Sequence, residues 1–219
     1  MAYSLVIFDV DGTLADSLPF LLSVVNQLAS QHGFLTISMQ DVPRLRQLPA
    51  RQIMRELQLP LYKLPRVSQQ FIQLMRQHAA QIPLFPGIDQ VLQQLAARGV
   101  QLAIVSSNAR PTVQHLLGND LTSLFCALEC GMSMFNKAHR LRQLLQRLAV
   151  APCQAIYIGD QTTDASAARQ AGIAFGAVSW GYNHIDALRA LAPAHEFADV
   201  QALYQLADGL PSATGYAKT

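Results

Sequence analysis

The segment that decides the fold is Tyr3–Thr13, which reads YSLVIFDVDGT. Its first six residues form a short, nearly continuous apolar run, which is typical of a strand buried on both faces of a parallel sheet. Asp9 and Asp11 follow at once, at the carboxyl end of the strand, and this is the edge of an open α/β sheet where ligands bind. Gly12 allows the backbone to turn sharply behind the two carboxylates. The segment therefore predicts a buried strand that delivers two carboxylates to a ligand site.

Other segments repeat the pattern of a buried strand. The predicted strands are Leu102–Val105, Ala155–Ile158 and Ala174–Val178. Between them lie stretches with apolar residues at the i, i+3, i+4, i+7 spacing of an amphipathic helix, such as 88–95 and 141–148. This alternation predicts the α/β class, with a Rossmann-like open parallel sheet connected by right-handed crossovers.

One long stretch breaks the alternation. From about Ser17 to Pro83 the sequence has no convincing strand, and apolar clusters near 21–28, 53–57 and 71–75 indicate helices separated by prolines. We expect a small all-helical cap that is inserted after the first strand. The predicted division is a catalytic core of residues 1–16 and 84–210, a cap of residues 17–83, and a flexible tail of residues 211–219.

Composition excludes several classes of protein. The 219 residues are 51% hydrophobic and 14% charged with a net charge of +2, which excludes a disordered chain and gives no basic surface for nucleic acid. Three cysteines are too few for a disulfide framework or a zinc site. No apolar run approaches the length of about 20 residues needed to cross a membrane, and no signal peptide is evident. A cytoplasmic protein is expected, while a monomer and a dimer remain equally open.

Two further aspartates follow another predicted strand. Asp160 leaves the strand at 155–158 after a single glycine, and Asp164 follows one helical turn later, so both can point to the same place. Alternatively, they cap the next helix. Together with Asp9 and Asp11 they form a candidate site for Mg²⁺, which prefers oxygen ligands and usually takes one or two carboxylates plus substrate phosphate.

Four carboxylates without opposing charge would repel one another, so the site needs a cation, and a phosphoryl group needs further positive donors. Lys137 is one of three lysines and begins a predicted helix. Without this context it would be an ordinary surface lysine. Ser106, at the end of another predicted strand, offers a hydroxyl to a phosphate oxygen or, alternatively, caps the next helix.

The order of these motifs resembles a known family. Residues 9–17 read DVDGTLADS, a predicted strand ends in Ser106, Lys137 follows, and residues 159–164 read GDQTTD. This order resembles the haloacid dehalogenase-like hydrolase superfamily, and more narrowly its phosphoglycolate phosphatase and β-phosphoglucomutase group, whose helical cap follows the first strand. Residues 180–182 resemble a later loop of that group, so the resemblance covers nearly the whole chain.

The resemblance implies a role for each motif residue in the chemistry. Asp9 would be the nucleophile that attacks phosphorus and forms an aspartyl-phosphate. Asp11 would protonate the leaving alcohol and then activate water. Lys137 would pair with Asp9 and the phosphoryl group. Asp11 also favours phosphate esters as substrates, because dehalogenases of this fold carry no carboxylate at that place.

The resemblance also implies the residues that hold the metal and the substrate. Mg²⁺ would be bound by the side chains of Asp9 and Asp160 and by the backbone carbonyl of Asp11. Asp164 would be a further metal ligand or a partner of Lys137. Ser106 would hold the phosphoryl oxygens, and Ser107 and Asn108 beside it are further candidates for substrate binding. From residue type we also expect at least one of two cap arginines, Arg46 and Arg51, to contact substrate, because arginine is suited to bidentate contacts with anions. Alternatively, these arginines lie on a solvated helix face.

The leading functional hypothesis is a Mg²⁺-dependent phosphatase that acts on a small phosphorylated metabolite, such as phosphoglycolate or a sugar phosphate. An alternative is a phosphomutase of the β-phosphoglucomutase type, whose cap must protect the aspartyl-phosphate from water. A third possibility is a binding or regulatory protein that retains the fold. The presence of Asp9, Asp11, Asp160, Asp164 and Lys137 argues against the third.

Overall fold

The computed structural model describes residues 3–131 and 136–208. Its centre is a six-stranded parallel sheet with the order β3-β2-β1-β4-β5-β6. The strands are β1 (Leu5–Phe8), β2 (Gln101–Val105), β3 (Phe125–Glu129), β4 (Ala155–Gly159), β5 (Ala174–Val178) and β6 (His195–Phe197). The predicted α/β fold is confirmed.

The strand order places the first motif at the centre of the sheet. β1 pairs with β2 on one side and β4 on the other, and Phe8 is in register with both Ile104 and Ile158. From β1 the chain continues through β2 to β3 on one side, and it then crosses to β4, β5 and β6 on the other. The boundary between β1 and β4 is thus the topological switch point, where open α/β sheets bind ligands.

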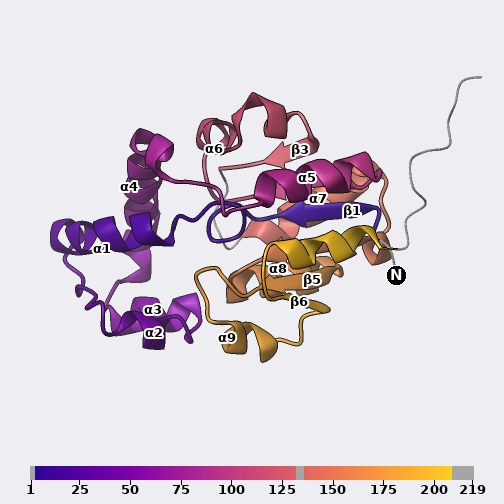
Figure 1. Ribbon diagram of the computed structural model, residues 1–219. Coiled ribbons are helices and arrows are strands. Elements are labelled where there is room, and N and C mark those ends of the chain that lie inside the picture. The colour runs from indigo at the N-terminus through magenta and orange to yellow at the C-terminus, as the bar shows by residue number, and fades with distance from the viewer. Residues whose placement is uncertain (1–2, 132–135, 209–219) are drawn as a thin grey trace, which may run out of the picture.

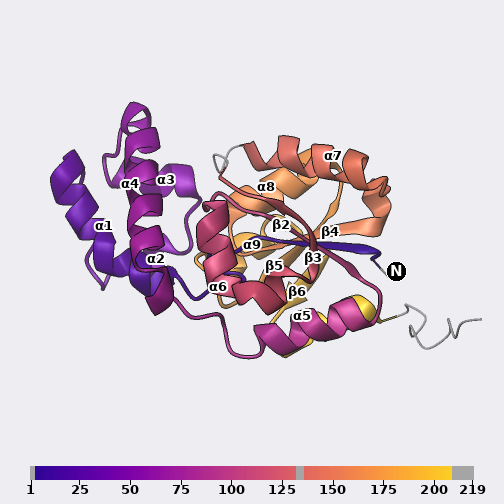
Figure 2. The same cartoon turned by 90° about the horizontal axis from the view of Figure 1, so that it is seen from above.

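Helices cover both faces of the sheet, as Figure 2 shows. Residues Val6 and Phe8 face one helical layer, Leu5 and Ile7 face the other, and all four are fully buried. This two-sided burial explains why β1 reads as a continuous apolar run. The first layer contains α5 (Ile88–Ala97), α6 (Arg110–Thr122) and η5 (Gln201–Ala207). The second layer contains α7 (Lys137–Leu148), α8 (Thr162–Ala171) and α9 (Ile185–Arg189). The short helix η4 (Pro152–Gln154) precedes β4.

Two strands were not predicted from the sequence, and both lie at the edges of the sheet. In β3, the exposed Cys126 and the half-buried Glu129 interrupt the apolar run. β6 contains only three residues, of which Glu196 is exposed. An edge strand needs less burial than a central one, so its sequence carries a weaker signal.

The residues after β1 form a separate group of helices beside the sheet (Figure 1). Three apolar residues, Val24, Leu28 and Val67, form a small cluster of their own. The helices are α1 (Leu18–His32), α2 (Val42–Leu45), α3 (Ala50–Glu56), η1 (Leu61–Lys63), α4 (Leu64–Gln77) and η2 (Ala79–Gln81). We propose that residues 17–83 are a cap on the core, as the sequence predicts.

The chain enters and leaves this helical group through two adjacent segments. Ala15 forms an isolated bridge with Leu84. The Asp16 amide donates to the Pro83 carbonyl at 2.9 Å, and the Phe85 amide donates to Leu14 at 2.9 Å. The insertion therefore begins and ends at one point of the core. Within residues 3–131 and 136–208, no helix is both long and apolar enough to span a membrane.

The packing of α5 against the sheet provides a test of the core. Leu92 is fully buried, whereas Gln93 on the same helix is exposed. We expect Leu92→Ala to lower the free energy of unfolding by about 2–5 kcal/mol, because it leaves a cavity in the core. Urea denaturation measures this loss. Gln93→Ala is the matched control, and an equal loss in both variants would contradict this packing.

Candidate active site

Lys137 connects two of the predicted site aspartates. Its Nζ donates to Asp9 Oδ2 at 2.6 Å and to Asp164 Oδ1 at 2.7 Å. All three side chains are buried. Asp9 follows β1, Lys137 begins α7 and Asp164 lies in the first turn of α8, so three segments that are distant in sequence meet at one cation.

The charges of this group explain the pKa shifts. Burial acts to lower the pKa of Lys137, but the charges of Asp164 and Asp9 hold it well above its usual value, so the amine stays charged. Burial raises the pKa of Asp9 to about 7, against the opposing effect of the Lys137 charge. Asp164 also accepts the Gln161 amide at 3.1 Å. It therefore caps α8 and pairs with Lys137, which unites the two roles that the sequence offered.

Asp160 is fully buried next to this group. Its Oδ1 accepts the Thr13 hydroxyl at 3.1 Å, and its Oδ2 accepts the Tyr182 amide at 2.6 Å. Burial and the charges of Asp164 and Asp9 raise its pKa well above the usual value. Gly12 has φ +77°, and a Cβ there would collide with the Asp160 carboxylate. Glycine at position 12 thus permits both the sharp turn and the close approach of Asp160.

Asp11 lies in a different environment from Asp9. Asn108 Nδ2 lies 3.2 Å from Asp11 Oδ2 and donates to it, and the Ser17 side chain also hydrogen-bonds Asp11. The Ser17 hydroxyl is in turn 2.9 Å from the Tyr182 hydroxyl. Burial raises the pKa of Asp11, while the bonds from Ser17 and Asn108 oppose the rise. A carboxyl group with a raised pKa is suited to donating a proton and later taking one.

The predicted phosphoryl-binding residues lie at the end of β2. Ser106 is fully buried, and its Oγ accepts the Asn108 amide at 3.2 Å. It does not cap α6, whose N-cap is Ala109. Asn108 is also buried and contacts Asp11, while Ser107 is partly exposed. Ser106 and Asn108 thus lie at the same sheet edge as the aspartates.

The acidic side chains fit a hard cation. Ligand atoms of Asp9, Asp160 and Asp164 lie within 4.8 Å of one another. Asp9 Oδ1 is buried, and it has no hydrogen-bond partner among the described residues. A buried oxygen without a partner is costly, and a cation would satisfy it. The Asp11 carboxylate is not part of this group of three.

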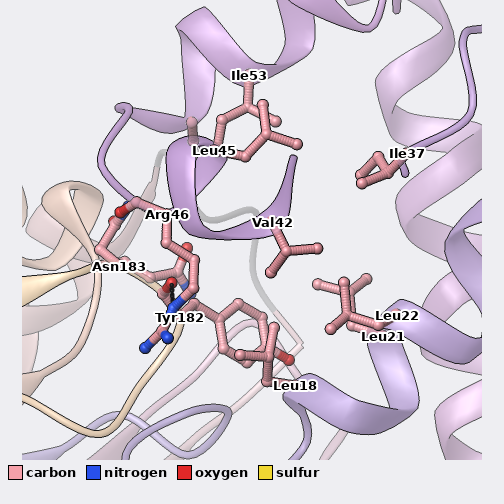
Figure 3. A pocket seen from close by; sticks show the side chains of 12 residues that line it. Leu18, Leu21, Leu22, Ile37, Val42, Leu45, Arg46, Ile53, Tyr182 and Asn183 are labelled. Atoms are coloured by element: carbon pink, nitrogen blue, oxygen red, sulfur yellow. Dashed lines mark hydrogen bonds between the residues drawn. The ribbon is translucent and has the colours of Figure 1, made fainter. Parts of the chain in front are cut away.

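The two cap arginines line different pockets. Arg46, which follows α2, donates from Nε to the Tyr182 carbonyl at 3.0 Å and from Nη2 to the Gly181 carbonyl at 2.7 Å. It also lines a mostly apolar pocket of about 120 Å³ between α1, α2, α3 and the core (Figure 3). Arg51 lines a larger cavity of about 830 Å³ beside α8. Their contact with substrate stays a prediction.

Four residues of the site environment were not singled out as site residues by the sequence. They are Thr13, which contacts Asp160; Ser17, which contacts Asp11; Tyr182, which contacts both Ser17 and Asp160; and Asn183, which contacts the cap. Thr13 and Ser17 belong to the first motif, so its full length carried the signal. Tyr182 and Asn183 lie in a loop after β5, and only the fold brings that loop to Asp160.

Comparison with known proteins identifies the class. Residues 6–178 match the family model for haloacid dehalogenase-like hydrolases. The chain belongs to this family.

Similar proteins indicate which reaction this member of the family catalyses. The phosphoglycolate phosphatase of Synechococcus elongatus is 36% identical over 189 residues, which cover 86% of this chain and 89% of the relative. The phosphoglycolate phosphatase of Xanthomonas campestris is 30% identical over 187 residues, which cover 81% of this chain and 83% of the relative. A crystal structure of a Lactobacillus plantarum protein, provisionally assigned the same activity, is 26% identical, has a TM-score of 0.79, and covers 94% of this chain and 100% of its own. The chain is accordingly a phosphatase, a phosphoric monoester hydrolase acting on a small phosphorylated substrate.

The position of Lys137 generates a prediction. Lys137→Met removes the ammonium between Asp9 and Asp164 and leaves two buried carboxylates without their partner. We expect the free energy of unfolding to fall by about 3–5 kcal/mol, as measured by urea denaturation. Arg140→Met is the matched control on α7, because Arg140 is about half exposed. The interpretation fails if the two variants lose the same stability.

Proposed function

We propose that this chain is a Mg²⁺-dependent phosphatase that hydrolyses a small phosphorylated metabolite, phosphoglycolate or a similar ester, through an aspartyl-phosphate. The observation that carries this proposal is the buried ion pair of Lys137 with Asp9, beside an Asp9 oxygen that has no hydrogen-bond partner among the described residues. That arrangement holds one carboxylate fixed and leaves one of its atoms available for phosphorus or for a cation.

In the first step, an Asp9 oxygen attacks the phosphorus atom of the ester. A bond forms between this oxygen and phosphorus, and the bond from phosphorus to the leaving alcohol breaks. Asp11 gives its proton to the alcohol oxygen, which leaves as a neutral alcohol. Lys137 and Ser106 stabilise the negative charge on the phosphoryl oxygens.

In the second step, water hydrolyses the aspartyl-phosphate. Asp11, now ionised, takes a proton from water as the water oxygen bonds to phosphorus, and the bond from phosphorus to Asp9 breaks. Inorganic phosphate leaves, and Asp9 returns as a carboxylate. Asn108 and Ser17 would orient the Asp11 carboxyl group, since both hydrogen-bond to it.

The residues that would hold Mg²⁺ are Asp9 and Asp160 through their side chains and Asp11 through its carbonyl, with Asp164 either ligating the ion or orienting Lys137. A bound Mg²⁺ supplies positive charge that offsets the repulsion between the carboxylates and the phosphate. Three buried carboxylates facing one ammonium support this assignment, because Lys137 alone does not balance their charge.

The proposed substrate class follows the relatives. Two of them are phosphoglycolate phosphatases that match more than four-fifths of this chain. The helical cap would close over the ester, exclude bulk water and contact the leaving group. The phosphomutase alternative predicts transfer of phosphate to a second sugar position, and a phosphatase predicts inorganic phosphate as the product.

Asp9→Asn tests the nucleophile. We expect wild-type protein to release p-nitrophenol from p-nitrophenyl phosphate with Mg²⁺, and EDTA to abolish this release. Asp9→Asn should lower kcat by at least about a thousandfold, because an amide is a poor nucleophile. Asp89→Asn on α5 is the control for loss of a carboxylate. Turnover by folded Asp9→Asn at the wild-type rate would exclude Asp9 as the nucleophile.

The two cap arginines test substrate contact. We expect at least one of Arg46→Ala and Arg51→Ala to lower kcat/KM for the best substrate of a phosphate-ester panel about tenfold, and to do so more than for p-nitrophenyl phosphate. Arg55→Ala is the matched control, since Arg55 is an exposed arginine of α3. If neither variant alters kcat/KM for any good substrate, neither arginine contacts substrate.

A further inference from the structure

A dense set of hydrogen bonds joins the cap to one core loop, residues 180–184 between β5 and α9. From the cap side, the Arg46 guanidinium donates to the carbonyls of Gly181 and Tyr182. From the core side, Asn183 Nδ2 donates to the carbonyls of Arg46 and Leu48, each at 3.0 Å. The bonds run in both directions, so the two segments fix each other in position.

A fifth bond completes the contact. The His184 amide donates to the Arg46 carbonyl at 2.7 Å. Asn183 is only 6% exposed, so its amide group is screened from solvent and its two donors have well-defined partners. Figure 3 shows Arg46 and Asn183 beside each other where the turn after α2 meets the core. We call these five bonds the cap latch.

Asn183 is connected to the core as well as to the cap. Its Oδ1 accepts the amide of Thr162, the first residue of α8, at 3.0 Å. The backbone amide of Asn183 donates to the Asp160 carbonyl at 3.2 Å. The Asn183 side chain therefore links the cap turn at Arg46–Leu48 to the helix that carries Asp164, and its backbone amide adds a bond to the strand end that carries Asp160.

The neighbouring residue extends this connection to the reacting groups. The Tyr182 amide donates to Asp160 Oδ2 at 2.6 Å, and the Tyr182 hydroxyl is 2.9 Å from that of Ser17, which hydrogen-bonds Asp11. Gly181 lies so close to Asp160 that an added Cβ would collide with it. A displacement of the 180–184 loop would thus move partners of both Asp160 and Asp11.

We propose that Asn183 and Arg46 are positioning residues, and that the cap latch, while it is formed, holds the cap and the acidic site in the catalytically competent arrangement. This inference rests on the proposed phosphatase function. It assigns no substrate contact to Asn183, which acts through the cap turn and through Tyr182. Breaking the cap latch lets the cap and the 180–184 loop move apart and misplaces Asp11 and Asp160.

Asn183→Asp removes the hydrogen bonds that the side chain donates to the cap and keeps the one that it accepts from the core. The carboxylate still accepts the Thr162 amide at the start of α8, where negative charge is favourable, but it cannot donate to the two cap carbonyls. The core should stay folded, with a melting temperature lowered by about a few degrees because two partly buried carbonyls lose this donor. We expect kcat/KM to fall about tenfold or more for every substrate, p-nitrophenyl phosphate included, because small misplacements at an active site are costly.

Hydrogen exchange gives a readout that does not depend on activity. In Asn183→Asp the His184 amide, which bonds to the cap, should exchange faster than in the wild type. The Asp9 amide, which bonds to Ile158 within the sheet, should keep its protection. Asn119→Asp, an exposed site on α6, is the control for an added charge and should match the wild type in both measurements.

A double variant tests whether Arg46 and Asn183 act as one unit. Arg46→Gln removes the two bonds that the guanidinium donates from the cap side. If Asn183→Asp fails to fold, the same kinetic and exchange measurements are made on Arg46→Gln. The kcat/KM of the double variant should be no lower than that of the more impaired single variant, because both substitutions break the same contact between cap and core. If the losses of kcat/KM in the two single variants multiply in the double variant, the cap latch is wrong. It is also wrong if Asn183→Asp shows wild-type kinetics and wild-type exchange at the His184 amide. A wild-type protein without phosphatase activity but with the expected exchange pattern overturns the proposed function instead.

Discussion

The Lys137 ammonium between Asp9 and Asp164 is the interaction on which the rest of the site depends. Burial disfavours charge on all three groups, and none would be stable in this place alone. Their mutual attraction offsets part of that cost and fixes the ends of β1, α7 and α8 relative to one another. The same pairing aligns one Asp9 oxygen and leaves the other without a protein partner among the described residues. The proposed catalytic geometry and the local stability therefore have the same origin.

The parallel sheet supplies the remaining geometry. Because β2, β1 and β4 are neighbours, the residues that follow each of them emerge at one edge. Ser106, Asp9 and Asp160 thus converge although about a hundred and fifty residues separate the first motif from the last. Asp9 and Asp11 are two residues apart, yet one pairs with an ammonium and the other with a hydroxyl and an amide. This contrast supports the proposed roles, in which Asp9 attacks phosphorus and Asp11 transfers protons.

The sequence was sufficient to predict the central strands and the positions of the acidic residues, because burial on both faces makes an apolar run and strand ends lie at one edge. It did not predict β3 and β6, where Glu129 and Glu196 reflect weaker burial at the sheet edges. It did not reveal Asn183, whose importance comes from a contact with the turn at Arg46 across 137 residues. For Arg46, residue type suggested an anion partner, which stays a prediction, but it did not reveal the bonds to the main-chain carbonyls of Gly181 and Tyr182 that the tertiary arrangement creates.

The adjacency of Ala15 and Leu84 has an evolutionary consequence. Since the helical insertion starts and finishes side by side, a different insertion could replace it without disturbing strand pairing or the buried charges beneath. Selection could then alter what enters the enzyme while the phosphorus chemistry stays constant. A fold arranged in this way is open to diversification by exchange of one module.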